Sequence, residues 1–176
     1  MAKPTEPGGV KDRIVSSSHL AKGNLAAVSE LEYGLIVAYN AFQRWITHCM
    51  AASGNHNLSA LEVIVLHNVN HRERAKRVAD ICFALNIEDT HTVTYALKKL
   101  ARQNLVEGDK RGKEIFYSTT QEGAGLCATY GNVRSNCLMD DALLSSQMIK
   151  ELESAAKILR TLSGAYDQAA RGAASY

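Results

Sequence analysis

The fold is decided by the stretch Thr92-Val93-Thr94-Tyr95-Ala96-Leu97-Lys98-Lys99-Leu100. Val93, Leu97 and Leu100 recur at intervals of three and four, which is the spacing of one helix face, so they are predicted to point into a core. Hydroxyl groups stand near the start of the remaining faces and lysines stand further along. We therefore expect an amphipathic helix from about Thr90 to Gln103 that turns its polar side outward.

Two helices are expected before this one. The first opens at Ser59, which is followed three residues later by Glu62 and so fits a capping box. The residues of this helix expected to face inward are Leu61, Ile64, Val65 and Val69. The second runs from Val78 to Leu85, after a polar, basic loop from His71 to Arg77. Asn86 to Thr90 forms the next turn, and either of its last two residues suits an N-cap.

A short basic hairpin is expected after the amphipathic helix. Leu105 to Glu107 and Glu114 to Ser118 read as strands, and Asp109 to Gly112 reads as the turn between them. Three helices and a hairpin between Leu58 and Thr120 are the parts of a winged helix-turn-helix. In such a module one helix fills the major groove of DNA and reads base edges, while the hairpin grips the backbone beside it.

The residues expected to contact DNA are those on the polar side of the amphipathic helix and on the hairpin. Threonine and tyrosine hydroxyls suit bases or phosphates, and lysine and arginine suit the backbone. The set is Thr90, His91, Thr92, Thr94, Tyr95, Lys98, Lys99, Arg102, Lys110, Arg111 and Lys113. The loop before the second helix adds the cations Arg72, Arg74, Lys76 and Arg77.

Long helices are predicted on both sides of this module. One spans about Leu25 to Ala52, a second begins at Thr119 or Thr120 and runs to about Met139, and a third begins at Asp140 or Asp141 and closes near Gly164. Apolar residues follow heptad-like spacing along the first and last of them. The seam residues expected at a dimer interface are Val28, Leu31, Leu35, Phe42, Trp45, Leu144, Met148, Leu152, Leu159 and Leu162. A module of about sixty residues cannot cover two such helices, so a homodimer is favoured over packing on the chain's own core.

The chain as a whole is expected to be mainly α-helical with a small β-hairpin wing, as a winged helix-turn-helix flanked by long dimerisation helices. The expected parts are a flexible N-terminal arm at 1–22, an N-terminal dimerisation helix at 23–54, the winged-helix module at 55–120, C-terminal dimerisation helices at 121–164 and a tail at 165–176. Both prolines lie in the first ten residues, which leaves the rest free for long helices.

Composition excludes several other classes. The chain has 176 residues and a net charge of only +2, and it contains no apolar run of about 18 residues that could span a membrane. Residues 1–11 lack the apolar stretch of a secretory signal, so a cytoplasmic location is expected. Neither a GxSxG, phosphate-loop nor HExxH motif occurs, so neither an enzyme nor a cofactor is expected.

Several of these segments together resemble the MarR-type transcription regulators. Leu58 to Leu66 resembles the helix that opens their DNA-binding module, Thr92 to Val106 resembles their recognition helix running into the wing, and Ser118 to Gly123 resembles the step that leaves the wing. The resemblance covers about Leu25 to Leu162 and implies a homodimer that binds a palindromic duplex of DNA. It also implies a small-molecule effector of unknown identity, in a cleft between the dimer helices and the DNA module. Many members have Arg where this chain has Tyr95.

Three alternatives stay open. Tyr95 in place of Arg and the low net charge favour a dimeric winged-helix adaptor that binds protein and not DNA. His67 and His71 have the i, i+4 spacing of a metal pair, but no Cys or carboxylate cluster nearby completes a site, so no metal is predicted. Cys49, Cys82 and Cys127 lie on apolar stripes, whereas Cys137 follows Arg134 by three residues and is the candidate for a redox-sensitive thiol.

Overall fold

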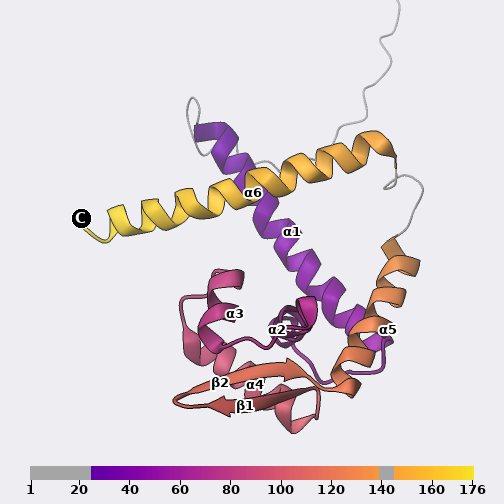
Figure 1. Ribbon diagram of the computed structural model, residues 1–176. Helices are drawn as coiled ribbons and strands as arrows, with labels where there is room; N and C mark the ends of the chain where they lie inside the picture. Colours follow the sequence, from indigo (N-terminus) through magenta and orange to yellow (C-terminus); the bar gives the residue numbers. More distant parts are fainter. Residues whose placement is uncertain (1–24, 139–144) are drawn as a thin grey trace, which may run out of the picture. The chain divides into compact units, whose positions relative to one another are not determined.

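The computed structural model describes residues 25–138 and 145–176 (Figure 1). The chain divides into two units, residues 1–46 and residues 47–176. Most of the first long helix, α1 (Leu25–Ala52), lies in the first unit, and its bounds are those predicted from the apolar spacing. It ends at Ala52, and Gly54 just after it takes a left-handed φ of 106°. No helix of the described part of the chain is long and apolar enough to cross a bilayer.

The second unit contains the winged helix. Its elements are α2 (Ala60–Asn70), α3 (Val78–Leu85), α4 (Thr90–Arg102), β1 (Val106–Arg111), β2 (Glu114–Thr119) and α5 (Gln121–Leu138). Figure 1 shows the hairpin of β1 and β2 beside α4. The core forms where α2 packs against α4, α5 and β2, and α3 packs against α4. Met50, Leu66, Ile81, Leu97 and Leu100 are its largest fully buried side chains.

Local sequence signals set the ends of α2 and α4 as expected. The Ser59 hydroxyl accepts from the amide of Glu62, and the Glu62 carboxylate accepts from the amide of Ser59 at 2.7 Å, which completes the capping box. Asp89 caps α4 by accepting from the amide of His91 at 2.9 Å. The predicted core face of α4, formed by Val93, Leu97 and Leu100, is fully buried.

The predicted inward face of α2 is partly wrong. Val65 and Val69 are buried as expected, but Leu61 and Ile64 are only half-buried. Val63 and Leu66 are buried in addition, although they were not predicted. The reason is that α2 is the central helix and packs against elements on several sides. A single apolar stripe is the mark of a surface helix and does not describe it.

The predicted hairpin turn is also wrong. The strands run to Arg111 and resume at Glu114, so Asp109 and Lys110 are strand residues and the turn is Gly112-Lys113. Gly112 has a φ of +64°, which a two-residue hairpin turn of this kind requires. An isolated β-bridge between Lys76 and the wing was not foreseen, because it involves one residue of the loop. Lys76 and Tyr117 exchange two backbone hydrogen bonds of 2.9 and 2.8 Å.

The last helix extends further towards the C-terminus than predicted. The start predicted at Asp140 or Asp141 lies outside the described residues. Helix α6 (Ser146–Ala173) is capped by the Ser145 hydroxyl, which accepts from the amide of Met148 at 3.2 Å. It runs through Gly164, where an end was predicted, and continues to Ala173 in place of a tail. One helical glycine costs only about 1 kcal/mol, and the alanines that follow favour helix.

Candidate nucleic-acid interface

Helix α4 separates its apolar and polar faces cleanly. Across from the buried Val93 and Leu97 it exposes His91, Tyr95 and Lys98 at positions i, i+4 and i+7, and Arg102 one turn further on. Tyr95 is 68% exposed, and the Lys98 ammonium lies 5.8 Å from the centre of its ring. This aromatic and cationic ridge has the width of one helix face, which is the shape that fits a major groove.

The threonines of α4 already have intramolecular partners. The Thr92 hydroxyl donates to the Asp89 carboxylate at 2.8 Å, and the Thr94 hydroxyl donates to the carbonyl of Thr90 at the same distance. The bond from Thr92, followed by the amide of His91, lowers the pKa of Asp89. Thr92 and Thr94 are half-buried, while Thr90 is exposed. Their hydroxyl oxygens keep lone pairs that accept a further bond, but their protons are engaged.

The two lysines of α4 have different surroundings. Lys98 is exposed, whereas the Lys99 ammonium lies 2.8 Å from the Glu62 carboxylate, whose side chain is only 13% exposed. Burial of Glu62 opposes its ionisation, but the hydrogen bonds from Lys99 and Ser59 outweigh burial and lower the pKa of this carboxyl. Lys99 therefore joins α4 to the first turn of α2.

The predicted cations of the wing, Lys110, Arg111 and Lys113, are all exposed. Lys110 and Arg111 are neighbours in β1, so their side chains leave opposite faces of the hairpin. The Arg111 guanidinium bonds to the Asp109 carboxylate at 2.7 Å and lies 4.8 Å from the centre of the Phe116 ring. Lys113 stands in the turn itself. The wing thus presents positive charge on both of its faces and at its tip.

Two residues with roles in this region were not singled out from the sequence. Arg77 was counted only as loop charge, but it holds the carboxylates of Asp80 and Glu114. Asn86 ends α3 with a left-handed φ of 52°, and its side-chain amide donates to Ser163 at 3.1 Å and to Asp167 at 3.3 Å. A left-handed asparagine is a usual helix end, but its partners on α6 carry no sequence signal.

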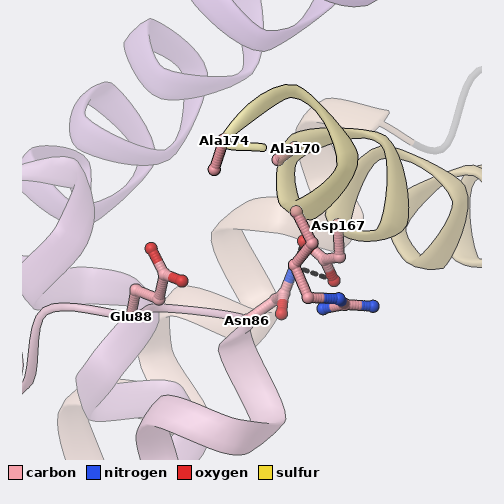
Figure 2. Close-up of a pocket in the computed structure, with 6 residues that line it drawn as sticks. Asn86, Glu88, Asp167, Ala170 and Ala174 are labelled. Atoms are coloured by element: carbon pink, nitrogen blue, oxygen red, sulfur yellow. Dashed lines mark hydrogen bonds between the residues drawn. The ribbon is translucent and has the colours of Figure 1, made fainter. Parts of the chain in front are cut away.

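A hollow of about 560 Å³ lies where the end of α3 meets α6 (Figure 2). Figure 2 shows the Asn86 side chain directed at Asp167, with Glu88, Ala170 and Ala174 around them. Both carboxylates and Arg171 border the hollow. The turn that precedes α4 is therefore in direct contact with the last helix of the chain.

His67 and His71, which have the spacing of a metal pair, do not lie on α4 or the wing, and neither do the cysteines. The His67 ring packs on Tyr130, with centroids 4.4 Å apart, while His71 is exposed. Within residues 25–138 and 145–176, no group of three or more metal-binding side chains gathers. Cys49, Cys82 and Cys127 are buried and Cys137 is exposed. Burial raises the pKa of the Cys127 thiol to about 11.

The apolar seams remain open to solvent in one chain. Val28, Leu31, Leu35 and Phe42 on α1 are exposed and Trp45 is half-buried. On α6, Leu152 and Leu159 are exposed and Met148 and Leu162 are half-buried. Leu144 lies outside the described residues. Such rows of exposed apolar side chains are unusual on a monomer.

Residues 58–123 match a family model described as a winged helix DNA-binding domain. The description of this model agrees with the predicted winged-helix module. A search among curated proteins found no match. Among solved structures, AbfR and two MarR proteins are similar to this chain, each with a TM-score of 0.63.

Reduced AbfR bound to DNA is 16% identical, and the match covers 78% of this chain and 95% of that one. MarR from Staphylococcus aureus in complex with salicylate and kanamycin is 14% identical, with coverage of 77% and 91%. A mutant MarR from E. coli complexed with operator DNA is 15% identical, with coverage of 78% and 99%. At such identities the likeness shows the fold, and the predicted MarR-like architecture is confirmed.

Proposed function

We propose, from a winged-helix DNA-binding domain set in the MarR fold, that this chain is a transcription regulator that binds double-stranded DNA. The observation that carries the proposal is the exposed face of α4, where Tyr95 and Lys98 stand over a fully buried apolar face. In this proposal α4 enters the major groove. The wing cations contact the backbone or the neighbouring minor groove.

The residues proposed to contact DNA keep unequal roles. His91, Tyr95, Lys98 and Arg102 form the exposed ridge, where His91 and Tyr95 are the proposed base contacts and Lys98 and Arg102 are the proposed contacts to flanking phosphates. Thr90, Thr92 and Thr94 lie at the start of the helix, where their oxygens are proposed to accept from the amino groups of bases. Lys110, Arg111 and Lys113 are the proposed contacts of the wing. Lys99 supports α4 through Glu62 and contributes its charge from the side.

The protein is proposed to act as a homodimer in the cytoplasm. Exposed leucines on α1 and α6 favour burial against a second copy, and a two-fold dimer presents two α4 helices to a palindromic site. A small-molecule effector that changes the spacing of the two copies is also proposed, since the similar MarR of Staphylococcus aureus was solved with salicylate and kanamycin. Sedimentation of the full chain tests the dimer, and a single protomer at micromolar concentration contradicts it.

A salt series with a random-sequence duplex tests the DNA-binding proposal. Each neutralised phosphate adds about 0.9 to the negative slope of log affinity against log salt concentration, so the regulator gives a steep line. The second candidate is a dimeric adaptor that binds protein, which the uncommon Tyr95 and the low net charge favour. That candidate shows no duplex binding even at low salt. Tyr95→Ala also distinguishes the two candidates, because it changes which duplexes are selected from a random pool only if the protein reads DNA sequence.

A further inference from the structure

Arg77 stands at the junction of the helix-turn-helix and the wing. It is the residue before α3, and its guanidinium holds the Asp80 carboxylate with two bonds, from Nε at 3.0 Å and Nη2 at 2.9 Å. Its remaining nitrogen, Nη1, donates to the Glu114 carboxylate at 2.9 Å. Glu114 is the first residue of β2, directly after the turn of the wing. One side chain thus joins the start of α3 to the exposed end of the hairpin.

An aromatic ring reinforces this junction. Phe116 follows Glu114 by two residues and so lies on the same face of β2. The Arg77 guanidinium lies 6.0 Å from the centre of that ring, and the Arg111 guanidinium lies 4.8 Å from it. Arg111 is also the cross-strand partner of Glu114. The ring therefore links Arg77 to a proposed DNA-contacting residue of the wing.

We propose that Arg77 is a positioning residue, which fixes the wing against α3 through Glu114 and Phe116 so that the wing cations and α4 meet one DNA duplex together. The inference rests on the proposed function, because it concerns how the same surface is held. Two-stranded hairpins are marginally stable by themselves. The base of this one is secured by the backbone pairing of Lys76 with Tyr117, whereas its end from Lys110 to Ile115 is exposed. A contact near the turn is what limits the motion of such an end.

The rival explanation is that Arg77 is a phosphate contact, as its place in a basic loop suggests. The geometry opposes this, because both acceptors of its guanidinium are carboxylates of the same chain. Asp80 is correspondingly acidic, since the hydrogen bonds from Arg77 lower its pKa to about 2. The Arg77 and Glu114 side chains are 40% and 54% exposed, so their ion pair adds little to global stability. We expect this ion pair to act instead by limiting the motion of the wing.

Glu114→Gln distinguishes the two explanations, because each predicts a change of opposite sign in the affinity for duplex. If charge alone matters, removing a carboxylate beside the DNA raises the affinity for duplex. If Arg77 positions the wing, the variant loses the anchor and binds about 3- to 10-fold more weakly. Glu107→Gln is the matched control, since Glu107 is an exposed acid on the same face of the same hairpin and has no contact with Arg77. The control is expected to bind as well as the wild type or up to 3-fold more tightly.

The experiment combines duplex binding with hydrogen–deuterium exchange of the full chain. The wing-tip variant Lys113→Ala is made in the wild-type and Glu114→Gln backgrounds. We expect Lys113→Ala to weaken binding 3- to 10-fold in the wild-type background and less than 2-fold in the Glu114→Gln background. The reason is that a mobile wing no longer holds Lys113 against the DNA. The amides from 110 to 115 should exchange at least 3-fold faster in Glu114→Gln without DNA, while those of α4 stay unchanged. Arg77→Lys should behave like Glu114→Gln, since an ammonium keeps the charge but cannot form the fork.

The outcomes separate the two levels of the proposal. Tighter binding by Glu114→Gln, or unchanged exchange in the wing, overturns the positioning role of Arg77 and leaves the regulator intact. A wild-type chain that binds no duplex overturns the proposed function and with it the role of Arg77 on DNA. In that case the exchange measurement still decides whether Arg77 holds the wing to α3.

Discussion

The Lys99 ammonium lies 2.8 Å from the Glu62 carboxylate, which ties the proposed recognition helix to the capping box of α2. Glu62 serves two partners at once, because its carboxylate also accepts from the amide of Ser59. Lys98, which directly precedes Lys99 in the chain, is exposed and faces the Tyr95 ring. Adjacent lysines of one helix therefore take separate roles, one in support and one in the proposed DNA contact.

Single replacements should resolve these two roles. Lys98→Ala is expected to reduce the slope of log affinity against log salt by about 0.9, the loss of one phosphate contact, with no change in stability. Lys99→Ala should reduce the slope by much less than Lys98→Ala does, and it should lower the free energy of unfolding by about 0.5–1 kcal/mol, because the pair is 40% exposed on the Lys99 side. Duplex titrations and urea unfolding measure the two effects. The same slope change for both variants would contradict the assignment.

Gly123 should be intolerant of a side chain. A Cβ at this position would collide with the backbone carbonyl of Leu105, where the first turn of α5 crosses the start of the hairpin. We expect Gly123→Ala to destabilise the fold by about 1–3 kcal/mol, as overpacking does in rigid cores.

Gly125→Ala is the matched control for this prediction. Gly125 lies in the same helix, and a Cβ there would meet nothing within 4 Å. This change should stabilise the chain by about 0.5–1 kcal/mol, since alanine favours helix over glycine. Thermal unfolding of the two variants gives the comparison, and a stable Gly123→Ala protein would show that α5 can shift away from Leu105.

His67 should make the stability of the protein sensitive to mild acid. Its ring packs on Tyr130, its Nε2 is buried without a partner among the described residues, and burial followed by the charge of Arg134 lowers its pKa below 6.5. The folded state thus binds its proton more weakly than the unfolded state does. Stability is fully present above pH 6.5 and declines as the pH falls below it, by up to about 1.4 kcal/mol per pH unit.

Urea unfolding at pH 7.5 and pH 5.5 measures this decline. His67→Gln removes the titrating group and should flatten the pH dependence, whatever its effect on stability at pH 7.5. His71→Gln serves as the control, because His71 is exposed four residues further along the chain. Equal acid sensitivity in the wild type and His67→Gln would assign the effect to another group.

One thiol should react much faster than the other three. Cys137 is exposed, while Cys49, Cys82 and Cys127 are buried, and burial raises the pKa of each buried thiol. Thiolates are the reactive form, so a disulfide reagent at neutral pH should modify one cysteine per chain rapidly. Cys137→Ser is expected to abolish that fast phase. A fast phase that survives in Cys137→Ser would show that a core thiol becomes accessible.

Periodicity located most of the helices because their apolar side chains recur on one face. The bounds of α1 and α3 and the core face of α4 follow directly from apolar spacing. Prediction failed where that condition did not hold. Helix α2 is packed on several sides, so Val63 and Leu66 were missed. The isolated β-bridge at Lys76 involves one residue, which is too short to form a pattern in the sequence.

The sequence by itself determined which segments are helical, where the wing lies and which face of α4 is polar, because these depend on residues within a few turns of one another. Only the tertiary structure decided which cations are free and which are engaged. Lys99 and Glu62 are 37 residues apart, and so are Arg77 and Glu114. Such pairs form only when the packing of α2, α3, α4 and the wing brings the two charged groups together. The spacing of residues along the chain does not predict that distance.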